Sequence, residues 1–341
     1  MSAQEVITTA KAMVAQGKGI LAMDESTGTC TKRFEALGIK STDESRRQYR
    51  DLLLTAPGLS DFISGAILYD ETIRQDVLDG TPFPRFMADN GILPGIKVDT
   101  GAKDLAGFPG EKITEGLDGL RERLAEYKKM GAKFTKWRAV ITIGDGIPSM
   151  GCIQANAHAL ARYAALCQEA GLAPIVEPEV LIDGDHIIER CYEVANETLH
   201  TVFNELYRQR VLFEGMILKP SMVISGKKCP QRAGVQEVAE KTVEVLLNNV
   251  PANVAGVAFL SGGQSNEEAT AHLNAMNQLG IDTPWPLTFS YARALQQPAL
   301  ELWKGDQKNV PAAQKALAFR AKLNSAASKG AYDEKQEKQA A

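Results

Sequence analysis

The feature that most constrains the fold of this chain is a repeated alternation of short apolar runs with segments of helical periodicity. Apolar runs of strand length that alternate with helical segments predict a parallel sheet whose strands are joined by crossover helices. Because the runs are almost continuously apolar, we expect the sheet to be covered on both faces. The eight runs are residues 19–23, 63–69, 95–98, 134–141, 173–180, 215–223, 254–260 and 287–291.

Eight such units within 341 residues predict an α/β fold of the (β/α)8 TIM-barrel type, built as one domain. An open, doubly wound sheet is the alternative, but no G-x-G-x-x-G follows the first run. We expect the barrel over residues 1–329, with an amphipathic helix at its start and a helical stretch over 306–328. Residues 330–341 are polar and without apolar periodicity, which predicts a flexible C-terminal tail. Helical periodicity is clearest in residues 117–130, 156–170, 186–208, 235–248 and 266–279.

Composition and charge argue against several classes of protein. The net charge is −4 and the longest apolar run is far shorter than a membrane span, so we expect neither a nucleic-acid nor a membrane partner. The N-terminal stretch lacks the apolar core of a secretory signal. Five widely spaced cysteines without a C-x-x-C predict free thiols in a reducing cytoplasm.

The sequence predicts no metal and no other cofactor. None of the four histidines stands in a metal-ligand spacing such as H-E-x-x-H. Asp183, Asp185 and His186 are close together, yet carboxylates in a polar loop before a helix are better explained as helix caps.

The residue at the end of the sixth apolar run is a lysine, Lys219, followed by Pro220. Lysine is rarely buried, and proline usually marks the end or the edge of a strand. A desolvated lysine beside another cation has a lowered pKa, and its neutral amine can form an imine with a carbonyl substrate. Taken alone, the stretch also fits a lysine that extends into solvent at a strand end.

Charged residues stand at the ends of most of the other runs as well. Side chains alternate between the two faces of a strand, so Lys136 and Arg138 should share a face, as should Glu177 and Glu179. In a barrel the C-terminal ends of the strands form the mouth that holds the active site. Charges at this density need each other or an anionic ligand. The mouth should hold Asp24, Lys97, Lys136, Arg138, Glu177, Glu179, Lys219 and Arg293.

An excess of cations at this mouth predicts a phosphorylated ligand. The stretches SGGQS and YARAL follow the seventh and eighth runs, where barrels often bind phosphate through backbone N–H groups. Lys97, Lys32 and Arg33 could hold a second phosphate, which points to a small bisphosphate. The carboxylates could instead hold a divalent metal, but no histidine joins them and the lysines would compete for them.

Taken together, these stretches resemble class I fructose-1,6-bisphosphate aldolases over about residues 18–295. The family's motifs occur here in the expected order as GILAMDESTGT, GIKVDTG, FTKWRAV, PIVEPEVL, ILKPSMV, FLSGGQS and TFSYARAL. The resemblance implies a lyase that reversibly cleaves fructose 1,6-bisphosphate to dihydroxyacetone phosphate and glyceraldehyde 3-phosphate. It also implies a lysine Schiff base in place of a cofactor, and a homotetramer.

The resemblance also implies a role for each matching residue. Lys219 forms the Schiff base, Glu177 transfers protons at the carbinolamine, and Asp24 engages the hydroxyl whose deprotonation drives carbon–carbon cleavage. Lys136 lies near the reacting centre and lowers the pKa of Lys219 by repulsion, and Glu179 orients these groups. The phosphate next to the keto carbon is held by Ser261, Gly262, Gly263, Ser290 and Arg293. The distal phosphate is held by Lys97, Arg138, Ser26, Arg33 and Arg46.

The sequence departs from the family pattern in three places. Ala292 replaces a usual glycine, which would cost roughly 1 kcal/mol if the backbone there had a positive φ. Ser221 stands where asparagine is common. The terminal tyrosine of animal relatives is replaced by Ala341, so Tyr332 either packs on the outer helices or folds over the mouth in its place.

Two other functions remain open from the sequence. One is a different Schiff-base enzyme, transaldolase-like or specific for sedoheptulose bisphosphate, and the other is a sugar-phosphate-binding scaffold without catalysis. Borohydride trapping of one lysine in the presence of dihydroxyacetone phosphate would distinguish the enzymes from the scaffold.

Overall fold

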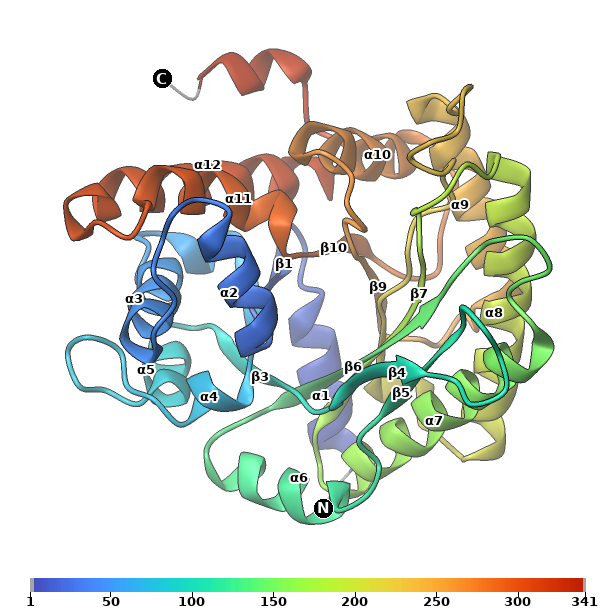
Figure 1. The fold of residues 1–341 in the computed structure, drawn as a ribbon, viewed down its shortest axis with the longest axis horizontal. Coiled ribbons are helices and arrows are strands. Elements are labelled where there is room, and N and C mark those ends of the chain that lie inside the picture. Colours follow the sequence, from blue (N-terminus) through green and yellow to red (C-terminus); the bar gives the residue numbers. More distant parts are fainter. Residues whose placement is uncertain (1–2, 340–341) are drawn as a thin grey trace.

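A computed structural model describes residues 3–339, and its centre is a closed barrel of eight parallel strands (Figure 1). Around the barrel the strands follow the order β1, β10, β9, β8, β7, β6, β3 and β2. The barrel strands are β1 Gly19–Ala22, β2 Ile63–Leu68, β3 Leu93–Lys97, β6 Phe134–Ile141, β7 Ala173–Val180, β8 Ile217–Leu218, β9 Gly256–Phe259 and β10 Leu287–Tyr291. Each of the eight apolar runs therefore contributes one strand, and the predicted barrel is confirmed.

Helices surround the barrel and cross over between its strands (Figure 1). The helix α7 begins six residues earlier than its periodicity suggested, because Ser149 caps it by accepting the N–H of Cys152 at 3.2 Å. Among the residues described, no helix has the length and apolar character needed to cross a membrane. The helices are α1 Ala3–Met13, α2 Thr27–Glu35, α3 Asp43–Leu54, α4 Asp70–Ile73, α5 Phe83–Asp89, α6 Leu120–Lys129, α7 Met150–Glu169, α8 Ile188–Arg208, α9 Val235–Asn249, α10 Asn266–Gln278, α11 Arg293–Trp303 and α12 Val310–Ala327.

The N-terminal helix α1 closes the barrel at the end opposite the predicted mouth. Its apolar face packs on the side chains that fill the barrel, among them Ile20, Phe134 and Ile217. Gly256, the first residue of β9, makes room for this helix, since a Cβ there would lie 2.7 Å from Val14. A second, larger apolar layer lies between the strands and the outer helices. With this end sealed, the mouth at the C-terminal ends of the strands is the side left for a ligand.

A two-stranded antiparallel hairpin, which the sequence did not predict, stands outside the barrel. It pairs β4 Gly101–Asp104 with β5 Lys112–Glu115 (Figure 1). The turn from β3 into β4 brings Thr100 and Ala102 to the edge of the mouth. The hairpin thus extends one wall of the cavity described below.

The C-terminal segment packs on the outer helices. Tyr332 is 7% exposed, and its hydroxyl donates to Glu337 Oε1 at 2.9 Å, while Arg320 of α12 donates to Glu337 Oε2 at 2.6 Å. A short 3-10 helix, Glu334–Gln339, follows. The interpretation that Tyr332 packs on the outer helices is confirmed. Apolar periodicity missed this anchor because it is made by charged and polar groups; the boundary at residue 329 and the mobility of the tail stay predictions.

Candidate active site

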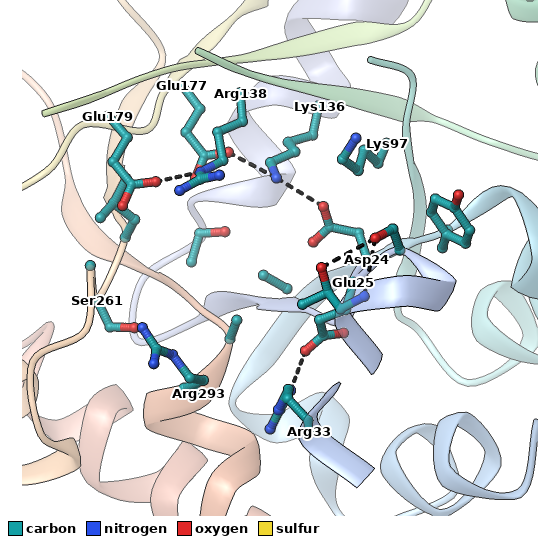
Figure 2. A pocket seen from close by; sticks show the side chains of 18 of the residues that line it. Asp24, Glu25, Arg33, Lys97, Lys136, Arg138, Glu177, Glu179, Ser261 and Arg293 are labelled. Carbon is teal, nitrogen blue, oxygen red and sulfur yellow. Dashed lines mark hydrogen bonds and ion pairs between the residues drawn. The ribbon is translucent and has the colours of Figure 1, made fainter. Parts of the chain in front are cut away.

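A cavity of about 790 Å³ opens at the C-terminal mouth of the barrel (Figure 2). It brings together all the residues that the sequence placed at the mouth, and all but one of the predicted site residues. The predicted residues that line it are Asp24, Ser26, Arg33, Lys97, Lys136, Arg138, Glu177, Glu179, Lys219, Ser261, Gly262, Gly263, Ser290 and Arg293. Arg46 does not line it: its guanidinium pairs with Glu71 and Asp43 instead.

Lys219 follows β8 directly and lies inside the cavity wall, 3% exposed. Its backbone N–H donates to Val176 O at 2.8 Å, so the register between β7 and β8 fixes its position. Its ammonium nitrogen Nζ lies 3.2 Å from Glu177 Oε1. Burial lowers the pKa of Lys219, Lys136 lowers it further, and the attraction of Glu177 only partly offsets these effects. The ammonium group of Lys219 therefore loses its proton more readily, and the neutral amine that results can act as a nucleophile.

Lys136 joins the two carboxylates on either side of the cavity floor. Its Nζ lies 2.8 Å from Asp24 Oδ2 and 3.0 Å from Glu177 Oε2 (Figure 2). Burial would lower the pKa of Lys136, but Asp24 and Glu177 outweigh it and raise the pKa. Burial likewise would raise the pKa of Asp24, yet Lys136 and Lys219 hold it at about 2. Lys136 is therefore a fixed cation beside a lysine that can become neutral.

The alternation of side chains along β6 and β7 produces this arrangement. Lys136 and Arg138 both face the cavity, whereas Trp137 between them packs outward on Tyr163 of α7, with 5.5 Å between ring centres. The parallel register sets Arg138 beside Glu177, and the Arg138 guanidinium pairs with Glu179. The predicted sharing of faces is confirmed for both strands.

One rim of the cavity has the features of an anion site. Ser261, Gly262 and Gly263 follow β9, and both glycines have positive φ, 54° and 87°. Arg293 begins α11 after β10, and among residues 3–339 its guanidinium has no hydrogen-bond or ion-pair partner. The buried hydroxyl of Ser290 also lacks a partner within the described chain. Unpaired donors at a helix N-terminus favour an anionic ligand.

The departures from the family pattern have clear local consequences. Ala292 has φ −101°, so the cost of a left-handed alanine does not arise. Ser221 accepts the N–H of Val180 at 3.0 Å and so ties the segment after Lys219 to the end of β7. Neither residue disturbs the groups around Lys219.

Two other cations of the cavity wall are already paired with carboxylates. Lys97 pairs with Asp99 on the side away from Arg293 (Figure 2). Arg33 pairs with Glu25 and also donates to Gln296 and Gln297 of α11, the helix that Arg293 begins, at 3.1 and 3.3 Å. Ser26 caps α2 by accepting the N–H of Thr29 at 3.3 Å. An anion entering here would have to compete with or rearrange these ion pairs.

Several residues of the cavity wall were missing from the prediction. Glu25 stands next to Asp24 in the sequence, which was an available signal, and it pairs with Arg50 at 2.8 Å as well as with Arg33. Asp99 shares the face of Lys97 and lines the cavity, as the alternation implied. Gln297 lies on α11, a helix that the sequence analysis did not predict, so nothing pointed to it.

Within the described part of the chain, no cluster of three or more histidine, cysteine, aspartate or glutamate residues could hold a metal ion. The loop carboxylates before α8 were interpreted as helix caps, but Ile187 stands at the N-cap of α8 and no side chain among the described residues caps the helix, so that interpretation is wrong. Asp183 instead lies 3.2 Å from Lys227 Nζ as an ion pair. The five cysteines are buried and have free thiols.

Comparison with known proteins gives concordant matches. A family model described as fructose-bisphosphate aldolase class-I matches residues 5–341. A Xanthomonas campestris pv. campestris protein, named probable fructose-bisphosphate aldolase class 1, is 62% identical over 97% of this chain and 99% of its own. The Arabidopsis thaliana protein named fructose-bisphosphate aldolase 5, cytosolic, is 51% identical over 97% of this chain and 92% of its own. The solved Plasmodium falciparum aldolase, in complex with TRAP and a small molecule inhibitor, has a TM-score of 0.95 and 48% identity, with 97% of this chain and 95% of that chain covered.

Proposed function

This chain belongs to the class I fructose-bisphosphate aldolase family, whose reaction is the reversible cleavage of fructose 1,6-bisphosphate through a lysine Schiff base, and from this premise we propose which of its residues perform each step. The observation that carries the proposal is a buried lysine, Lys219, whose close carboxylate, Glu177, also pairs through its second oxygen with the cation of Lys136. Burial favours the neutral amine, which is the form that attacks a carbonyl.

In the first step the Lys219 amine adds to the C2 carbonyl of the open-chain sugar and forms a carbinolamine. Glu177, 3.2 Å from Lys219 Nζ in the free enzyme, takes the proton that the ammonium gives up before it attacks and passes it to the departing hydroxyl, which leaves as water. The product is a protonated imine on C2. Lys136 keeps its positive charge beside Glu177 throughout, because the pKa of Lys136 is raised.

In the second step Asp24 binds the C4 hydroxyl and receives its proton as the C3–C4 bond breaks. The electron pair of that bond moves into the imine and gives an enamine, while the C4 fragment leaves as glyceraldehyde 3-phosphate. Lys136 lies 2.8 Å from Asp24 Oδ2, so the C4 hydroxyl shares this carboxylate with the Lys136 cation. Protonation of the enamine at C3 and hydrolysis of the imine then release dihydroxyacetone phosphate.

The two rims of the cavity support a site for each phosphate. We assign the phosphate next to the keto carbon to the unpaired donors of Ser261, Gly262, Gly263, Ser290 and Arg293. Figure 2 draws Ser261 and Arg293 on the side of the cavity away from Lys97. We assign the distal phosphate to Lys97, Arg138, Ser26 and Arg33, and we leave Arg46 out because its ion pairs lie outside the cavity.

The test of these roles is a steady-state cleavage assay on fructose 1,6-bisphosphate. Lys219→Ala should abolish cleavage because no other amine near C2 has a lowered pKa, whereas the exposed Lys228→Ala should match the wild type. Thermal unfolding of both variants checks that the fold is kept. Substantial cleavage by Lys219→Ala would refute the assignment.

For assembly and location we propose a homotetramer in the cytoplasm. Large apolar side chains exposed on neighbouring outer helices, Tyr207 of α8 and Leu247 of α9, support contacts between copies. The five free thiols support a reducing compartment. Light scattering on the purified protein tests the tetramer, and fractionation of the source cells tests the location.

A further inference from the structure

The loop that follows Lys219 carries a lysine that no motif brought into the site. Lys227 lies in this loop, between β8 and α9, and the backbone around it is fixed. Gly226, Lys227 and Lys228 donate their N–H groups to His186 O, Ile182 O and Gly184 O at 2.8, 2.9 and 2.8 Å. Three consecutive hydrogen bonds to the segment after β7 hold the loop, so the start of the Lys227 side chain has a defined place.

From that place the side chain of Lys227 reaches the predicted phosphate rim. A Cβ built on Gly263 would lie 2.6 Å from Lys227 Nζ and 3.1 Å from a terminal nitrogen of Arg293. The ammonium and the guanidinium thus approach the same side of Gly263, although they come from different loops. The positive φ of 87° favours glycine at this position, whereas the ends of the two flexible side chains could move aside.

Two cations that converge in this way repel each other unless an anion lies between or beside them. Within residues 3–339 the Arg293 guanidinium has no hydrogen-bond or ion-pair partner. Lys227 pairs with Asp183 at 3.2 Å, and the Asp183 carboxylate is largely exposed. An exposed ion pair of this kind is weak, so a phosphate dianion can replace it. Lysine binds phosphate as a point charge and complements the planar fork of an arginine.

We propose that Lys227 is a further phosphate-binding residue, which acts with Arg293 on the phosphate next to the keto carbon. The inference rests on the function proposed above and adds a residue to it. Lys227 stands at the rim, outside the side chains that line the cavity; its ammonium already lies at Gly263 and binds the phosphate by giving up Asp183. Substrates that carry this phosphate, namely fructose 1,6-bisphosphate, fructose 1-phosphate and dihydroxyacetone phosphate, should all depend on it.

The test compares Lys227→Gln, which removes the charge, with Lys227→Arg, which keeps it. The neighbouring Lys228→Gln is the matched control, because Lys228 is also exposed and the side-chain atoms nearest to Gly263 belong to Lys227 and Arg293. Lys227→Gln should raise KM about threefold to tenfold for both fructose 1,6-bisphosphate and fructose 1-phosphate, with kcat within about twofold. Lys227→Arg and Lys228→Gln should keep both KM values within about twofold.

Three results would overturn the proposal. They are an unchanged KM in Lys227→Gln, an equal rise in Lys228→Gln, and a rise for the bisphosphate but not for fructose 1-phosphate. The last would place Lys227 at the distal phosphate. Borohydride trapping of Lys227→Gln with saturating dihydroxyacetone phosphate separates this question from the chemistry. Labelling of Lys219 as in the wild type is expected, and labelling elsewhere in the wild type would contradict the proposed function without deciding the role of Lys227.

Discussion

At the scale of single residues, the two lysines in the cavity wall have opposite properties although both are buried. Lys219 has one close carboxylate and a neighbouring cation, and its pKa is lowered. Lys136 lies between two carboxylates, and its pKa is raised. The sequence predicted that both lysines lie at the mouth, but it did not predict how many carboxylates lie close to each. The place of Lys219 at the end of an apolar run already suggested imine chemistry, the resemblance assigned it as the nucleophile, and its surroundings now supply a physical reason.

This contrast predicts the effect of removing the fixed cation. In Lys136→Met the pKa of Lys219 should rise, because repulsion from Lys136 is lost while attraction to Glu177 and Asp24 remains. Imine formation needs the neutral amine, so the pH dependence of cyanoborohydride trapping should shift to higher pH. Lys97→Met is the control, since the pKa of Lys219 is governed mainly by burial, Glu177, Lys136 and Asp24. A midpoint that stays in place, or moves to lower pH, would contradict this electrostatic account.

Arg293 and Arg46 provide a matched pair for the phosphate assignment. Arg293→Ala should raise KM for fructose 1,6-bisphosphate and for dihydroxyacetone phosphate about tenfold or more, because charge-assisted hydrogen bonds are worth about 1.5–3 kcal/mol. Arg46→Ala should change KM less than about twofold, since its guanidinium is engaged by Glu71 and Asp43. Equal rises in KM in the two variants would contradict this assignment and would indicate that Arg46 also binds phosphate, as the resemblance implies.

At the scale of secondary structure, strands were predictable and several helices were not. The barrel strands are buried on both faces, so their apolar runs are visible in the sequence. The buried side of α3 instead carries Arg46, Arg50 and Asp51, which hides its amphipathic pattern. The helix α11 contains Pro298, which usually ends a helix. The strands β4 and β5 are short and polar and have no apolar alternation.

A helix behind the phosphate rim gives a prediction about pH. His272 of α10 is buried, and its ring nitrogen Nδ1 lies 2.6 Å from Gln264 Oε1. Gln264 directly follows the two glycines of the rim. Burial lowers the pKa of His272 to about 4 from its ordinary 6.5. Above pH 6.5 the ring is neutral in both the folded and the unfolded chain. As pH falls from 6.5 toward 4, the unfolded chain binds the proton first, and the folded state loses on the order of 3 kcal/mol.

The free energy of unfolding of His272→Asn should therefore depend less on pH than that of the wild type. Urea unfolding at several pH values between 4 and 8 measures the free energy of unfolding of the variant and of the wild type. The two curves should be parallel above pH 6.5 and converge below it. Curves that remain parallel down to pH 4 would show that His272 does not titrate with a lowered pKa.

At the scale of the whole molecule, the parts that the sequence predicted best are those that repeat. The eight strands and the mouth follow from one pattern used eight times, so an error in one unit does not change the fold. The first helix and the C-terminal segment lie outside this repeat and are held by different kinds of contact. The helix α1 seals the barrel with its apolar face, as an amphipathic pattern allows, whereas the C-terminal segment is anchored by Arg320 and Glu337.

The C-terminal segment should matter for stability more than for turnover. Deletion of residues 332–341 removes Glu337 from the buried Arg320, so Tm should fall by several degrees. The value of kcat for fructose 1,6-bisphosphate should change less than threefold, because Tyr332 packs on the outer helices. A collapse of kcat with imine trapping intact would show instead that the tail takes part in proton exchange at the enamine.

Every step proposed above depends on an imine formed by Lys219. The most direct measurement is borohydride reduction in the presence of dihydroxyacetone phosphate, followed by mass spectrometry of the proteolytic peptides. We expect one adduct per chain, on the peptide that contains Lys219 and on that residue, with Lys136 unmodified although it lies in the same cavity. An adduct on Lys136 or any other lysine, or full cleavage activity in a protein that gives no adduct, would contradict the account.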